Sequence, residues 1–225
     1  MEIRKAKLLQ KLIQQGEHQQ QDFKFCINDS RKIAKSLVAF ANTDGGRLLI
    51  GVKDNGHITG VRSEEEYYMV EAAATIYSKP TINFETKQWT VEGKTVLEVT
   101  IVPSPEKPHF AKDETGKWIA YIREGDENLL ANRIQVEVWK KQKSPKGIFF
   151  TYSDNERFLI NYLSGNYSIS LSKFIRLAHV NRYKAIDILS NFVLIGLLLI
   201  RPGQNSTEFI LNHNFEQEEL AKFQL

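Results

Sequence analysis

The stretch from residue 38 to residue 54, VAFANTDGGRLLIGVKD, places an apolar helical pattern, a Thr-Asp-Gly-Gly turn and a buried strand in direct succession. Gly45 and Gly46 stand where the helix must end, because glycine permits the φ > 0 conformations and the close backbone packing of such a sharp reversal. The turn has neither the G-x-x-x-x-G-K-[ST] spacing of a phosphate loop nor a G-x-G-x-x-G sequence. ATP binding at this turn is therefore not expected.

Helical and strand patterns surround this turn on both sides. Helical spacing is expected over residues 3–13, 29–44, 63–77 and 129–141, and strand patterns over 17–27, 47–52, 81–91, 94–103, 109–113 and 117–125. Tight turns separate the later strands, which predicts an antiparallel meander. Residues 1–145 are thus predicted to form one α+β domain, with a mixed or antiparallel sheet and flanking helices.

A basic, polar segment, KKQKSPKG at residues 140–147, interrupts the packed elements. It predicts a linker over about 141–150 and two domains, 1–145 and 146–225. Beyond it, helical patterns at 154–163, 171–179 and 182–192 precede two strand-like runs around a Pro-Gly-Gln-Asn-Ser turn. This order is typical of a small winged helix-turn-helix domain, although the short link HVN lacks the glycine often found in the motif.

Three features of the sequence limit the compartment. The single cysteine, Cys26, excludes an intramolecular disulfide framework and favours a reducing cytoplasm. The most apolar run, residues 192–200, is shorter than the roughly 20 apolar residues that a membrane helix needs. The amphipathic N-terminus lacks the continuous apolar core of a signal peptide. A cytoplasmic protein with no membrane partner is expected.

Three segments together resemble a known family. They are GEHQQQDFKF, then VAFANTDGGRLLIGVKDNGHITGV, then KPHFAKDETGKWIAYIREGDENLLA. In this order they resemble the Schlafen-type AlbA-like DNA-binding domain, also called the divergent AAA family. The resemblance covers most of the N-terminal domain and implies nucleic-acid binding. Bacterial members with a C-terminal winged helix are described as transcriptional regulators, and the architecture expected here is similar.

The resemblance also implies three acidic site residues. Some animal members are ribonucleases with three carboxylates, which match Glu17, Asp22 and Asp54 here; Asp22 replaces the usual glutamate. Three carboxylates at strand ends could hold Mg²⁺ or Mn²⁺ and activate water for phosphodiester cleavage. The alternative is that Asp44 and Asp54 cap backbone N–H groups in turns and that Glu17 is solvated.

Basic side chains are candidates for nucleic-acid contacts in both domains. In the first domain the candidate phosphate contacts are Lys24, Arg47, Lys53 and Arg123, with ordinary surface cations as the alternative reading. In the winged helix the candidates are Asn181, Arg182, Tyr183 and Lys184 at the start of the third helix, and Arg201 in the wing. The sequence between residues 168 and 212 contains five basic residues and two acidic residues.

Two functions follow from these patterns. The first is a non-catalytic transcriptional regulator, in which the winged helix binds DNA and the first domain adds phosphate contacts or senses a ligand. The second is a metal-dependent endoribonuclease using the acidic triad, with RNA as substrate and Mg²⁺ or Mn²⁺ as cofactor. The regulator is favoured, because Asp22 departs from the family pattern and the winged helix is appended. A protein-interaction role for the winged helix, including homodimerisation, is the alternative to DNA binding.

Overall fold

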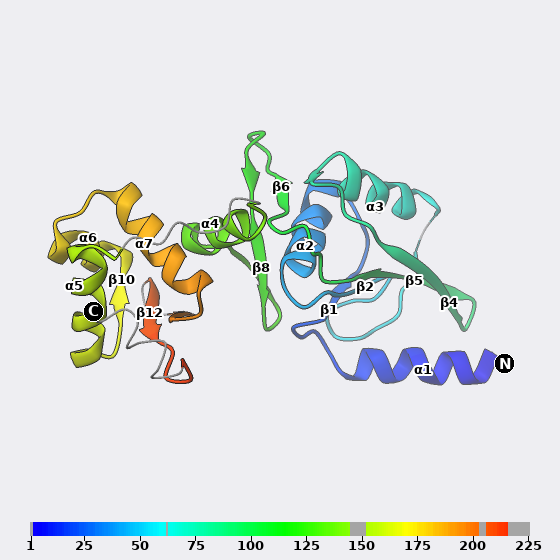
Figure 1. Cartoon of the computed structure of the whole chain (residues 1–225). Helices are drawn as coiled ribbons and strands as arrows, with labels where there is room; N and C mark the ends of the chain where they lie inside the picture. Colours follow the sequence, from blue (N-terminus) through cyan, green and yellow to red (C-terminus); the bar gives the residue numbers. More distant parts are fainter. Residues whose placement is uncertain (1, 62, 145–151, 203–205, 216–225) are drawn as a thin grey trace. The chain divides into compact units, whose positions relative to one another are not determined.

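The computed structural model describes residues 2–61, 63–144, 152–202 and 206–215. The chain divides into two compact units, Met1–Ala131 (unit 1) and Asn132–Leu225 (unit 2). Both units contain helices and strands, and in unit 1 the strands β3 to β9 follow one another without an intervening helix (Figure 1). The predicted α+β fold is therefore confirmed.

Unit 1 is built on a four-stranded mixed sheet with the order β1-β2-β5-β4. The strands are β1 (Gln21–Lys24), β2 (Gly46–Ile50), β4 (Glu85–Val91) and β5 (Lys94–Ile101). β1 and β2 are parallel and are connected by α2 (Ser30–Asn42), whereas β5 is antiparallel to both of its neighbours. The predicted hairpin around Gly93 is confirmed by the pairing of β4 with β5.

Helices cover both faces of this sheet. α1 (Glu2–Gln14) lies on one face, and α2 and α3 (Glu65–Thr75) lie on the other (Figure 1). Adjacent residues of β2 alternate between the two faces: Leu48 packs in the cluster of α2 and α3, and Leu49 packs in the cluster of α1. The apolar run in β2 is thus explained by burial on both sides.

Short strands complete unit 1. They are β3 (Ser78–Lys79), β6 (Phe110–Lys112), β7 (Trp118–Ile119), β8 (Tyr121–Glu124) and β9 (Glu127–Leu130). β8 and β9 form a hairpin that packs on α2. The expected helix over 129–141 therefore begins too early, since residues 127–130 pair as a strand. The helix α4 (Arg133–Gln142) begins after Asn132, whose side-chain oxygen accepts a hydrogen bond from the Gln135 N–H at 2.8 Å.

The helix α4 belongs to unit 2, not to the α+β domain in which it was expected. Ile134 and Val138 lie in the apolar core of unit 2, and Lys141 Nζ lies 2.7 Å from Asp187 Oδ1 on α7 (Arg182–Leu194). The division between the units thus falls before α4, whereas the expected boundary followed residue 145. The expected linker begins within α4, which ends at Gln142, and residues 143 and 144 follow the helix. Residues 145–150 of the expected linker lie outside the described residues.

The rest of unit 2 follows the predicted order of elements. It contains α5 (Asp154–Gly165), β10 (Ile169–Ser170), α6 (Leu171–Ala178), α7, β11 (Leu198–Pro202) and β12 (Thr207–Leu211). The three strands form an antiparallel sheet with the order β10-β12-β11. His179, in the link without glycine, takes the left-handed conformation with φ +52° and ends α6. Residues 203–205 of the expected turn lie outside the described residues.

The most apolar run spans two elements. Phe192 lies near the end of α7 and Ile200 lies in β11, as predicted for a buried helix end joined to a strand. Within the described ranges, no helix has the length and apolar character that crossing a membrane requires.

Candidate nucleic-acid interface

The Gly-Gly turn between α2 and β2 allows the backbone to pack closely against a neighbouring segment. Gly45 has φ +70°, and a Cβ atom placed there would lie 2.6 Å from the Ile101 carbonyl oxygen. No side chain other than hydrogen fits this approach without movement of the backbone. The expected close backbone packing at this turn is confirmed.

Asn42, just before the turn, connects α2 to two distant segments. Its Nδ2 donates to the carbonyl oxygens of His109 and Tyr121, each at 2.9 Å, and its Oδ1 accepts from the His109 N–H at 2.8 Å. Asn42 is buried, so these bonds satisfy backbone groups that water does not reach. Asn42 of the FAN-T-x-GG segment therefore connects α2 with the segments around His109 and Tyr121.

Asp22, the second residue of the expected acidic triad, lies in a buried network. Its carboxylate accepts a hydrogen bond from Ser36 Oγ on α2 at 3.2 Å, and Lys24 Nζ lies 2.8 Å from its Oδ2. Arg123 Nη2 on β8 lies 3.8 Å from its Oδ1. Asp22 is only 3% exposed. Lys24 and Arg123 thus balance the charge of Asp22. The network of contacts around Asp22 joins β1, α2 and β8.

Glu17 lies next to Asp22. Its Oε1 accepts a hydrogen bond from the Phe23 N–H at 2.8 Å. The pKa of Glu17 is raised, first by burial and then by hydrogen bonding with Asp22 and by the charge of Asp22, while the Phe23 bond and Lys24 act in the opposite direction. Two of the three carboxylates are therefore brought together.

Asp54 is exposed in the turn after β2. Among the residues that the structure describes, no three His, Cys, Asp or Glu side chains gather in a way that could hold a metal ion. The expected metal set of Glu17, Asp22 and Asp54 is thus not assembled in this conformation. The alternative reading of Asp44 as a turn cap also differs from the structure, since its Oδ2 accepts from Gln19 Nε2 at 2.9 Å.

The four expected phosphate contacts of unit 1 have different surroundings. Arg123 is 2% exposed and donates to the carbonyl oxygens of His18 and Gln21, so the alternative reading of Arg123 as an ordinary surface cation is wrong, and its burial does not favour the expected phosphate contact. Lys24 is committed to Asp22, and Arg47 Nη1 lies 3.4 Å from Glu98 Oε1. Lys53 is exposed, with its Nζ 5.4 Å from the centroid of the Phe25 ring. Unit 1 therefore presents few uncommitted cations at these positions.

The first turn of α7 in unit 2 presents exposed side chains at two of the expected contact positions. Arg182 and Tyr183 are exposed, and Tyr183 is 78% exposed. Asn181 caps the helix by accepting from the Lys184 N–H at 2.9 Å, so its side chain has a structural task. Lys184 Nζ lies 3.5 Å from Glu156 Oε1, and Arg201 Nη1 donates to the Tyr167 hydroxyl at 3.0 Å. Of the five expected contacts, Arg182 and Tyr183 are exposed and take part in none of these side-chain bonds.

A cavity of about 210 Å³ lies beside Arg182, at the first residues of α4, α6 and α7. Its polar lining includes Arg133, Arg182, Ser170, Ser172 and Thr207. The N-terminal end of a helix carries a partial positive charge and free N–H groups, and arginine and hydroxyl groups bind anions well. The chemistry of this cavity suits a phosphate group.

Sequence reasoning missed Arg133 and the two serines. The sequence pattern predicts a helix from residue 129, which puts Arg133 in its second turn. The pattern therefore does not indicate that Arg133 is the first residue of a helix. A signal was present in the pair Asn132-Arg133, a capping residue followed by a cation, and again in the pair Asn181-Arg182. The guanidinium of Arg133 lies 5.9 Å from the centroid of the Tyr183 ring, which joins α4 to the exposed face of α7.

The family of the chain follows from a match over residues 17–132 to the Schlafen AlbA_2 family. This range covers slightly more than half of the chain and ends at the division between units 1 and 2. The chain therefore belongs to the Schlafen AlbA_2 family, as its sequence motifs predicted.

Two solved structures are similar to the chain. The crystal structure of the DIP2311 protein from Corynebacterium diphtheriae matches with 18% identity and a TM-score of 0.42, covering 65% of this chain and 34% of that protein. The solution structure of the N-terminal domain of a RecG-related protein from Nitrosomonas europaea matches with 23% identity and a TM-score of 0.41, covering 57% of this chain and 95% of that domain. No curated protein matches the chain significantly.

Proposed function

We propose that the chain is a DNA-binding transcriptional regulator whose unit 2 is a winged helix-turn-helix. In this proposal α6 and α7 form the helix-turn-helix, α7 enters the major groove, and β11 and β12 form the wing. The order of α5, α6 and α7 before an antiparallel pair of strands supports it, as does the tight link at His179.

The observation that carries the proposal is the cavity lined by Arg133 and Arg182. In a helix-turn-helix complex, helix N-terminal ends and basic side chains contact backbone phosphates, whereas the first exposed residues of the recognition helix contact bases. Arg182 and Tyr183 have the exposure that base or backbone contacts require, and the cavity has the chemistry of a phosphate site. Lys184 contributes less in this proposal, because Glu156 already neutralises its charge.

The surroundings of the acidic residues in unit 1 favour the regulator over the ribonuclease. Asp22 is enclosed by Lys24, Arg123 and Ser36, which compete with any cation for its oxygens. Asp54 is exposed and belongs to no cluster of possible metal ligands in the described part of the chain. These carboxylates therefore do not favour phosphodiester cleavage.

The experiment is a titration of a fluorescent duplex pool of random sequence with the whole chain over a series of salt concentrations. Binding should weaken steeply with salt, with a dissociation constant of about 10⁻⁴ to 10⁻⁶ M for non-specific sites near physiological salt. Repeated selection from the pool should then enrich a sequence motif. Absence of salt-dependent binding would refute the proposal. A parallel incubation of structured RNA with Mn²⁺ or Mg²⁺ should leave the RNA intact.

A further inference from the structure

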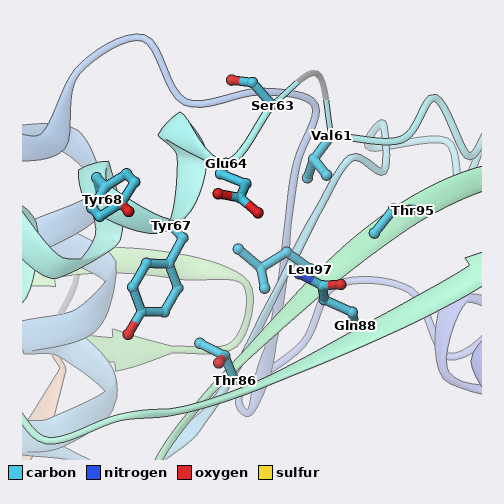
Figure 2. A pocket seen from close by; sticks show the side chains of 9 residues that line it. All are labelled: Val61, Ser63, Glu64, Tyr67, Tyr68, Thr86, Gln88, Thr95 and Leu97. Carbon is cyan, nitrogen blue, oxygen red and sulfur yellow. The ribbon is translucent and has the colours of Figure 1, made fainter.

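A second cavity lies in unit 1, between the first turn of α3 and the β4–β5 hairpin. It measures about 540 Å³. Gln88 on β4 pairs with Leu97 on β5, and both residues line the cavity. Leu97 is buried and forms an apolar floor, and Thr86 and Thr95 also line the cavity (Figure 2).

Glu64 contributes a carboxyl group to this cavity. Among the described residues that line it, no other side chain carries a carboxyl, ammonium or guanidinium group. Its side chain does not cap α3, and Figure 2 shows its carboxylate above Leu97. The carboxylate forms no hydrogen bond or ion pair with any residue that the structure describes. It is therefore free to accept bonds from a ligand.

Tyr67 supplies an aromatic wall beside Glu64. Its ring packs against Phe84 and Tyr68, with centroid separations of 6.2 and 5.8 Å, which hold it in position. Tyr67 is nevertheless 39% exposed. The face of a tyrosine ring attracts cations, and the attraction adds to that of a nearby carboxylate. A carboxylate and an aromatic ring beside an apolar floor suit a cation with a hydrocarbon part.

We propose that this cavity binds an organic cation, an ammonium or guanidinium group on a short alkyl chain. The charged group would lie between Glu64 and Tyr67, with its remaining N–H groups directed to Thr86 or Gln88, and the alkyl chain would cover Leu97. A phosphate is disfavoured, because Glu64 and the neighbouring Glu65 would repel it. Such a ligand has two sources, a free polyamine or a lysine or arginine side chain of a peptide.

The test uses the whole chain without DNA, so its outcome is independent of the proposed DNA binding. Calorimetry would measure the binding of spermidine and of a blocked Gly-Arg-Gly peptide. Tighter binding of spermidine identifies a free polyamine as the source, and tighter binding of the peptide identifies a protein side chain. If neither binds at millimolar concentration, or if adenosine binds in their place, the proposal is wrong.

Matched variants separate the cavity from general surface charge. Glu64→Gln should weaken binding of the better probe about tenfold, because a charge-assisted hydrogen bond is lost. Glu85→Gln makes the same charge change on β4 outside the cavity and should leave affinity unchanged. Equal effects of the two substitutions would overturn the proposal. Circular dichroism would confirm that both variants fold.

Two further variants test the aromatic wall. Tyr67→Phe keeps the ring face and should retain affinity within about twofold, whereas Tyr67→Leu should weaken binding several-fold. Equal affinities of Tyr67→Leu and the unaltered chain would contradict the role of the ring.

Discussion

Arg123 Nη2 lies 3.8 Å from Asp22 Oδ1, and the two side chains are 1% and 4% exposed. The sequence had suggested a phosphate contact for Arg123 and a metal ligand for Asp22. Together they instead form a buried charge pair that joins β8 to β1, and the Arg123 guanidinium also lies 5.2 Å from the centroid of the Phe40 ring. Removal of Asp22 would therefore leave Arg123 as an unpaired charge in the interior of unit 1.

Asp22→Ala should destabilise unit 1 by about 3–5 kcal/mol, because it leaves Arg123 as a buried charge without its carboxylate partner. Urea unfolding followed by NMR signals of unit 1 would measure the loss. Asp54→Ala, at an exposed position, should change the free energy of unfolding by less than about 0.5 kcal/mol. Equal small effects would mean that Asp22 is not a structural anchor.

Glu17→Gln should alter the pH dependence of stability. The folded-state pKa of Glu17 lies above its usual value of 4.5. Its stabilising contribution is therefore complete below that value and is lost as the pH rises through the folded pKa. Glutamine resembles the protonated acid and still accepts a bond from the Phe23 N–H.

The variant should consequently gain stability relative to the unaltered chain as the pH rises from about 4 to 7. Unfolding free energies of both proteins at several pH values would measure this gain. A difference that does not change with pH would show that Glu17 titrates alike in the folded and unfolded states.

Gly51→Ala should be more harmful than Gly93→Ala. Both glycines have positive φ, +94° and +74°. A Cβ at Gly51 would lie 2.7 Å from the Gly60 carbonyl carbon, whereas none of the surrounding atoms lies within 4 Å of a Cβ at Gly93. Gly93→Ala should cost about 1–2 kcal/mol of backbone strain, and Gly51→Ala should cost more. Similar melting temperatures for the two variants would argue against the close packing of Gly51 and Gly60.

Local patterns predicted much of the fold, because periodicity and turn residues act over short distances. The Gly-Gly turn, the β4–β5 hairpin and the helices of unit 2 follow from such signals. The partner of α4 could not be predicted, since an amphipathic helix does not reveal which core it will cover. For the same reason the burial of Arg123 was hidden: its partners His18 and Gln21 are more than 100 residues away.

The central claim is that the helix starts of unit 2 contact DNA phosphates. The most direct measurement is the slope of log affinity against log salt for Arg133→Ala, Arg182→Ala and Lys140→Ala in the whole chain. Lys140 is the matched control, since it is an exposed cation at the opposite end of α4 from Arg133.

Arg133→Ala and Arg182→Ala should each reduce the magnitude of the slope by about 0.9, the share of one duplex phosphate contact, and Lys140→Ala should leave it unchanged. Slopes for all three variants that equal the slope of the unaltered chain would contradict the account.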